Sequence, residues 1–188
     1  MTSAVSRTLP LPLRKGDWLQ TYKGVQFWPM DARPEEVDIG DIAHALAHQC
    51  RFGGHTNSFY SVAQHSVIVS NNVPNHLAVQ GLLHDATEAY IVDVPTPIKK
   101  YLTNYKEIEH GLAKVIGRRF GVELADLSKE VKSADARALW TEKRDLRGPT
   151  PAAWGVPRRN PFFELIQPLP PGAAEVLFLE RCRELGVK

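Results

Sequence analysis

Apolar residues recur at helical spacing along most of this chain, and no segment shows the sustained alternation of a half-buried strand. Ile39, Ile42 and Leu46 repeat at i, i+3 and i+7, directly after Asp38, whose side chain suits the N-cap of a helix. Further helices are expected at residues 61–71, 75–92, 104–120, 127–145 and 173–186. The pattern predicts an all-α bundle.

Proline-rich segments flank this helical part. The chain up to about residue 34 contains Pro10, Pro12, Pro29 and Pro34, so we expect an irregular N-terminal strap with a short hairpin around residues 23–24. Residues 147–172 hold seven of the fourteen prolines and should also be irregular. We therefore predict a single domain over residues 1–188, with a core at about 38–145 and a closing helix at 173–186.

The composition excludes several classes of protein. With 188 residues, 43% of them hydrophobic, the chain is long enough for one soluble globular domain. A formal net charge of +2 gives no reason to expect binding to polymeric nucleic acid or to a membrane surface. No run reaches the ~18 apolar residues of a membrane span, and prolines interrupt any signal peptide. We expect a cytoplasmic protein in which Cys50 and Cys182 are free thiols.

Histidine is concentrated in one part of the chain, since six of the seven lie between His44 and His84. His65, the His84-Asp85 pair and Asp135 all fall on expected helices. Two imidazoles and two carboxylates form a nitrogen and oxygen donor set that suits a first-row divalent ion. These residues are far apart in sequence, so only a bundle that turns them inward would bring them to one centre. The alternative is a group of polar residues that are each satisfied by hydrogen bonds.

Two more carboxylates accompany this set. Glu88 is i+4 from His84 and i+3 from Asp85, which places the three on one flank of a helix. A carboxylate there could accept a proton from a water beside the ion, or could merely orient a ligand. Asp93 follows the helix and could turn back toward the same water or the leaving group, although an aspartate before Val-Pro is also an ordinary turn residue.

The strings YSVAQHS, LLHDATEAY, DVPTPIK and KSADARALW resemble the HD-domain metal-dependent phosphohydrolases. The likeness is greatest to the branch that contains bacterial 5'-deoxynucleotidases and phage dATP triphosphohydrolases, and it runs over residues 39–140. It implies an HD-domain helical bundle with a divalent transition metal (Mn, Co, Zn or Fe, or alternatively Mg). The implied ligands are His65, His84, Asp85 and Asp135. The resemblance implies that Glu88 and Asp93 act on the attacking water and on the phosphate.

The resemblance also implies an arginine and an aromatic residue ahead of the first ligand, where this chain has Arg51-Phe52. Arg51 offers a planar fork to phosphate oxygens, and Phe52 could fill the space beside the 2' position of the sugar. Lys99 could add a second cation near the phosphate, and His55 could reach the substrate. The alternatives are a surface arginine, a core aromatic residue, a solvated lysine and a loop histidine fixed by hydrogen bonds.

These residues predict a metal-dependent phosphohydrolase of small nucleotides, in which water attacks phosphorus in line. We favour a 5'-deoxynucleotidase that releases phosphate from a deoxynucleoside monophosphate. A deoxynucleoside triphosphate triphosphohydrolase is the first alternative, with extra cations sought among Lys99, Lys100, Arg118 and Arg119. A hydrolase of a signalling nucleotide and a non-catalytic nucleotide-binding sensor are the others. We also expect a homo-oligomer, because the family commonly forms dimers or larger assemblies.

Two further groups of residues have a structural and a functional interpretation. His44 and His48, spaced i, i+4, could chelate a second ion, but the sequence offers no further ligand nearby. We favour a polar helix face or a subunit contact for this pair. Four tryptophans are expected in the core rather than as a platform for base stacking, namely Trp18, Trp28, Trp140 and Trp154.

Overall fold

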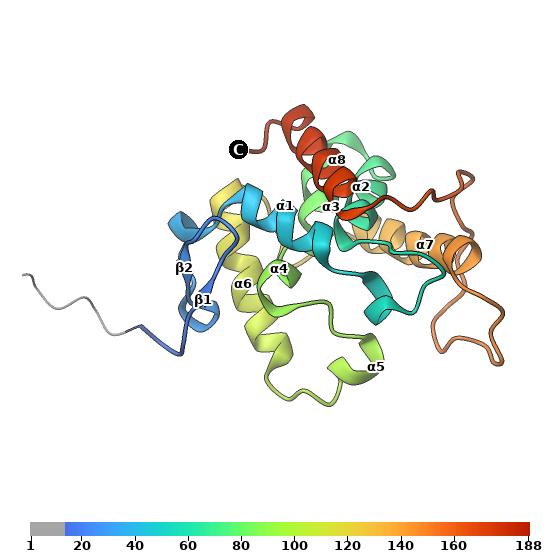
Figure 1. Cartoon of the computed structure of the whole chain (residues 1–188), viewed down its shortest axis with the longest axis horizontal. Helices are drawn as coiled ribbons and strands as arrows, with labels where there is room; N and C mark the ends of the chain where they lie inside the picture. Colours follow the sequence, from blue (N-terminus) through green and yellow to red (C-terminus); the bar gives the residue numbers. More distant parts are fainter. Residues whose placement is uncertain (1–13) are drawn as a thin grey trace, which may run out of the picture.

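The computed structural model describes residues 14–188, and over this range the chain is an all-α bundle preceded by a two-stranded hairpin (Figure 1). The strands are β1 (Leu19–Gln20) and β2 (Gln26–Phe27). The helices are α1 (Ile39–His48), α2 (Val62–Asn71), α3 (Ala78–Leu83), α4 (Glu88–Ile91), α5 (Thr96–Lys99), α6 (Tyr105–Phe120), α7 (Lys129–Leu146) and α8 (Pro171–Glu184). The expected hairpin is confirmed by the antiparallel pairing of Leu19 with Phe27, whereas Pro10 and Pro12 lie outside the described residues.

Local signals in the sequence explain where several helices begin and end. Asp38 caps α1 by accepting hydrogen bonds from two backbone N–H groups of the first turn. Ser61 and Ser128 cap α2 and α7, and the side chain of each accepts one backbone N–H hydrogen bond. Gly121 ends α6 in the left-handed conformation, with φ of 67°, which costs glycine no clash of a Cβ atom. The helix expected directly after Asp38 is confirmed.

The continuous helix expected over residues 75–92 is wrong. Helix α3 ends at Leu83 and α4 begins only at Glu88, and the chain between them forms tight turns. The backbone N–H of Glu88 donates to the carbonyl of Asp85 at 3.0 Å, which is the i→i−3 pattern of a 3₁₀ turn. The break therefore falls on the His84-Asp85 pair. The short α5 is a further difference from the helices expected from the sequence. Proline interrupts a helix interior but is accommodated in the first turn, where Pro97 lies.

The core lies where α8 packs across α1 and α2, close to α3 (Figure 1). Ile42, Leu46, Leu82 and Phe178 are fully buried there. Each such side chain contributes about 1.5–3 kcal/mol through burial. Helix α7 packs against α2 on another side. The C-terminal helix thus contributes to a core that we expected only at about residues 38–145. Helix α2 lies between α8 and α7.

The expectation that the four tryptophans belong to the core is wrong. Trp18 is 49% exposed and the other three are only partly buried. Residues 147–170 are irregular, as predicted, and this segment places Trp154 near Trp140, with ring centroids 6.0 Å apart. The Trp140 indole N–H donates to the carbonyl of Pro157 at 3.0 Å. Trp140 on α7 therefore contacts the proline-rich segment in two ways, by packing near Trp154 and by its hydrogen bond to Pro157.

The structure bears on two features that the composition predicted, the state of the cysteines and the lack of a membrane-spanning helix. Cys50 and Cys182 are free thiols, and burial raises the pKa of Cys182 to about 12. No helix within residues 14–188 has both the length and the hydropathy to cross a membrane.

Candidate metal centre and pocket

The structure brings the four expected ligands together from three parts of the bundle. His65 Nε2, on α2, lies 3.3 Å from Asp135 Oδ1 on α7 and 3.3 Å from His84 Nε2. Asp85 Oδ2 lies 3.3 Å from His84 Nε2 and 3.6 Å from His65 Nε2. Ligand atoms of His65, His84 and Asp135 all lie within 4.8 Å of one another, so these three residues form the group that could hold one ion. Asp85 contacts both imidazoles but is not part of that group, so its carboxylate would have to shift to join the other three. The nitrogen and oxygen donor set therefore suits the divalent ion that the sequence predicted.

Close packing of α3 on α2 makes this convergence possible. A Cβ atom on Gly81 would lie 3.1 Å from the Cα of Ser70, so glycine permits the close approach of the two helices. The carbonyl of Gly81 also accepts a hydrogen bond from His84 Nδ1 at 2.8 Å, which orients the imidazole with Nε2 toward His65. The tight turn after α3 then directs Asp85 toward the same group.

Sequence reasoning missed Glu142, a fully buried carboxylate beneath His65. His65 Nδ1 lies 2.6 Å from Glu142 Oε1, and the Tyr60 hydroxyl donates to the same oxygen at 3.0 Å. A carboxylate that accepts the second N–H of a ligating histidine fixes its tautomer and orientation. One sequence signal was available, because Glu142 follows Asp135 by seven residues and thus lies on the same face of α7.

Charges around His65 determine its protonation in the metal-free protein. Burial and the charge of Arg51 oppose the imidazolium, but Glu142 and Asp135 outweigh them and raise the pKa of His65 to about 9. The charge of His65 in turn holds the pKa of Asp135 well below its ordinary value, against the effect of burial. A divalent ion must displace the proton of His65 to bind, so its affinity should rise with pH.

Arg51 lies between two carboxylates of this centre. Its Nη1 is 3.4 Å from Asp85 Oδ2 and its Nη2 is 3.4 Å from Glu142 Oε2. The side chain is only 11% exposed, and the neighbouring carboxylates keep its pKa above the ordinary value despite burial. Arg51 therefore balances the negative charge of the site, and it also lines the adjoining pocket.

Glu88 is buried next to the centre and incompletely paired. It is 4% exposed, and its Oε2 has no hydrogen-bond partner within residues 14–188. Burial, followed by the charges of Asp85 and Asp93, raises the pKa of Glu88 well above its ordinary value. Lys99 partly opposes this rise, with its Nζ 3.7 Å from Glu88 Oε1 and 3.1 Å from Glu109 Oε1. The structure thus places Lys99 beside Glu88 rather than in the pocket.

A pocket of about 730 Å³ adjoins the centre. Three of the four expected substrate contacts line it, namely Arg51, Phe52 and His55, and Asp93, which was expected to act in catalysis, lines it too. Trp154 and Arg147 from the proline-rich segment line it as well, together with Lys100. The Arg147 guanidinium lies 4.9 Å from the Phe52 ring centroid and 5.3 Å from that of Trp154. The pocket therefore combines cationic side chains with aromatic ones. The contribution of the proline-rich segment to it was not predicted, because no local pattern indicates where that segment folds.

Backbone strain marks two positions beside this pocket. Phe52 has φ of 56° and Val92 has φ of 60°, and they are the only non-glycine residues with positive φ in the described part of the chain. Such conformations are costly, above all for β-branched valine, and persist only where the surrounding structure imposes them. The Tyr105 hydroxyl donates to the carbonyl of Val92 at 3.1 Å, and the next residue is Asp93. The strained residue Val92 thus sets the direction of the backbone between the end of α4 and Asp93.

Comparison with known proteins places the chain in a family. No family model matches it. The chain is 40% identical over 171 residues to the uncharacterized protein YfdR of Escherichia coli, across 90% of this chain and 96% of YfdR. It belongs to the family of YfdR. An uncharacterized protein of Rhodobacter capsulatus is 30% identical over 147 residues, 71% of this chain and 75% of that protein.

More distant relatives of this YfdR-family chain have names that state an activity. The 5'-deoxynucleotidase of Erwinia tasmaniensis is 27% identical over 144 residues, 68% of this chain and 65% of that protein. The 5'-deoxynucleotidase of Vibrio parahaemolyticus is 29% identical over 124 residues, 57% of this chain and 56% of that protein. The matches thus span about two thirds or less of these relatives. The chain is a distant relative of proteins named 5'-deoxynucleotidase.

Proposed function

We propose that this protein is an HD-domain phosphohydrolase of small nucleotides, with deoxynucleoside 5'-monophosphates as the favoured substrates. The observation that carries the proposal is the convergence of His65, His84 and Asp135 from three parts of the bundle, with Asp85 beside both imidazoles. Arg51 connects this group to the pocket, since it contacts Asp85 and also lines the pocket. The names of the distant relatives support the same activity.

The residues fit a divalent metal ion as the cofactor. His65, His84, Asp85 and Asp135 would hold it, with Glu142 fixing the orientation of His65. When bound, such an ion lowers the pKa of water and offsets negative charge on a phosphate. The side chain of Asp135 is 45% exposed, so the centre is open on that side to solvent and substrate.

Glu88 is the residue that we assign to proton transfer. In the reaction, the oxygen of water forms a bond to phosphorus, the bond from phosphorus to the 5'-oxygen breaks, and the water proton passes to Glu88 Oε2. That oxygen is free to accept, since it has no partner in the described chain. A carboxyl with a raised pKa exchanges protons nearer to neutral pH than an ordinary one. Asp93 lines the pocket and could supply the proton that the leaving 5'-oxygen needs.

The pocket would hold the phosphate at one end and the nucleoside at the other. Arg51 reaches both the centre and the pocket, so its remaining N–H donors are placed for a phosphate oxygen. Phe52 and Trp154 offer aromatic faces to the sugar and the base, with ring centroids 6.2 Å apart. His55 is exposed at the rim and could contact the sugar. Lys99 would act on Glu88 rather than on the phosphate, given its contacts.

A triphosphate substrate is the second candidate, and one observation favours it. Lys100 and Arg147 both line the pocket, so cations beyond Arg51 are available for further phosphates. Arg118 and Arg119, the other arginines expected as candidates for further phosphates, do not line it. Attack at the α-phosphorus would then release triphosphate instead of inorganic phosphate.

The proposal is tested by measuring product release from a panel of deoxy- and ribonucleoside mono- and triphosphates with added Mn²⁺, Co²⁺ or Mg²⁺. We expect metal-dependent release of inorganic phosphate from deoxynucleoside monophosphates. Release of triphosphate would instead establish the second candidate. Nucleotide binding without turnover, under every metal condition, would contradict the hydrolase and favour a nucleotide sensor.

A further inference from the structure

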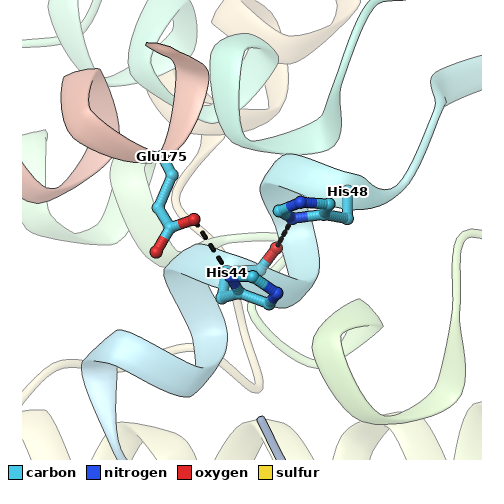
Figure 2. A group of neighbouring side chains, drawn as sticks. All are labelled: His44, His48 and Glu175. Carbon is cyan, nitrogen blue, oxygen red and sulfur yellow. Dashed lines mark hydrogen bonds and ion pairs between the residues drawn. The ribbon is translucent and has the colours of Figure 1, made fainter. Parts of the chain in front are cut away.

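A second group of potential metal ligands lies between the first and last helices of the bundle. His44 and His48 are one turn apart on α1, and Glu175 reaches toward them from α8 (Figure 2). His44 Nδ1 lies 3.0 Å from Glu175 Oε2. One ligand atom from each of the three residues lies within 4.8 Å of the others. Sequence reasoning could not find this third ligand, because 131 residues separate Glu175 from His44.

The spacing of the two histidines allows them to share a metal ion, once their rings turn out of the stacked arrangement in which the centroids are 4.1 Å apart. Imidazoles at i and i+4 share one face of a helix, and a carboxylate completes the nitrogen and oxygen set that binds Zn²⁺ and related ions. His48 Nδ1 lies 2.8 Å from the carbonyl of His44, so this nitrogen carries the proton and Nε2 keeps a free lone pair (Figure 2). A backbone carbonyl that orients a ligating histidine in this way is a regular feature of metal sites.

The surroundings of His44 hold its ring in place and add negative charge. Tyr22 stacks on the ring with 3.6 Å between the centroids. Asp41, one turn earlier on α1, is 3% exposed, and its Oδ2 has no hydrogen-bond partner within the described chain. Asp41 and His44 line the same small pocket of about 360 Å³, which shares no residue with the pocket beside the metal centre. Asp41 is not one of the three clustered residues, so its negative charge would act on a cation there only at longer range.

We propose that His44, His48 and Glu175 form a second divalent metal site that ties the C-terminal helix α8 to α1. The His44 and Glu175 side chains are 26% and 22% exposed, so an ion can enter from solution and water can complete its coordination. Because α8 supplies Phe178 to the core, an ion held by both helices would stabilise the packed bundle. This site would be structural and independent of nucleotide hydrolysis.

Counting bound ions tests the proposal directly. Bound metal is first removed from the full chain with a chelator. The protein is then dialysed against Zn²⁺ at a free concentration that saturates the wild type, and bound Zn²⁺ is measured by elemental analysis. We expect two ions for the wild type and for the control His76→Ala, which alters an exposed histidine outside the cluster. We expect one ion for His48→Ala and for Glu175→Gln. A wild-type count in both of these variants would overturn the second site.

The variant Asp135→Ala separates this proposal from the proposed function. It should retain one ion, and addition of His48→Ala should remove that ion as well. If Asp135→Ala retains two ions while His48→Ala retains one, the proposed catalytic centre fails and the second site stands. If Asp135→Ala alone abolishes all binding, the second site is overturned.

Thermal unfolding gives a readout that does not depend on counting. In the Asp135→Ala background, Zn²⁺ at a hundredfold excess over its dissociation constant should raise the unfolding midpoint by about 5 °C or more. The same addition should leave the midpoint of the Asp135→Ala, His48→Ala double variant unchanged. An equal shift in both proteins would show that the stabilising ion binds elsewhere.

Discussion

Replacing Glu88 by glutamine is expected to lower nucleotide turnover by about a hundredfold or more without loss of the bound metal. Glutamine keeps the size of the side chain but cannot accept the proton of the attacking water. The measurement is the turnover number of the metal-loaded enzyme, with bound metal determined on the same sample. Glu109→Gln is the matched control, because it removes the other carboxylate partner of Lys99 without altering the centre. Wild-type turnover in Glu88→Gln would remove this residue from the mechanism.

Although Glu88→Gln should lower turnover, it should raise the free energy of unfolding of the metal-free protein. Because the pKa of Glu88 is raised, the folded protein binds more protons than the unfolded chain above the ordinary glutamate value of 4.5. The free energy of unfolding of the metal-free protein therefore falls as pH rises through this range. Glu88→Gln removes that dependence, so it should stabilise the metal-free protein at about pH 8 more than at about pH 5. A raised activity together with a lowered stability would contradict both expectations.

Replacing Glu142 by glutamine is expected to weaken both the metal centre and the fold. Glu142 is fully buried and balances the charges of Arg51 and His65. Loss of one partner from a buried charged group costs about 3–5 kcal/mol, and the hydrogen bond from Tyr60 that glutamine can keep suggests the lower end. Metal affinity should fall about 10–100-fold, because the orientation of His65 is less well fixed.

Two measurements check this second prediction. Urea denaturation of the metal-free protein gives the change in the free energy of unfolding, and a metal titration gives the change in affinity. Glu130→Gln is the control on the same helix, since Glu130 makes no side-chain hydrogen bond or ion pair among residues 14–188. Equal stability and equal affinity for Glu142→Gln and Glu130→Gln would show that Glu142 does not support the centre.

Features with a local cause could be predicted from the sequence. Asp38 and Gly121 set the ends of their helices through caps that involve only nearby backbone groups. The spacing of His65, the His84-Asp85 pair and Asp135 indicated a metal centre, because a helix bundle has few ways to arrange four such residues. The resemblance to a known family supplied the order of those residues and the expected reaction.

Features that depend on contacts between distant segments were missed. The sequence predicts a continuous helix through the turn after α3, because no proline or glycine interrupts residues 82–91. Trp154 lines the pocket only because the proline-rich segment folds back over α7, which no local pattern indicates. Glu175 meets His44 for a similar reason, since α8 returns to pack on α1. In each case tertiary packing, not the local sequence, determines the neighbours of the residue.

Anomalous X-ray diffraction from crystals of the Co²⁺-loaded protein tests most directly whether the predicted ligands hold an ion. We predict a cobalt peak about 2.0–2.2 Å from Nε2 of both His65 and His84 and from one oxygen of each of Asp85 and Asp135. A peak at the cluster between α1 and α8 would be a separate result. Cobalt-loaded crystals with no peak among these four residues would contradict the metal centre on which the proposed hydrolysis depends.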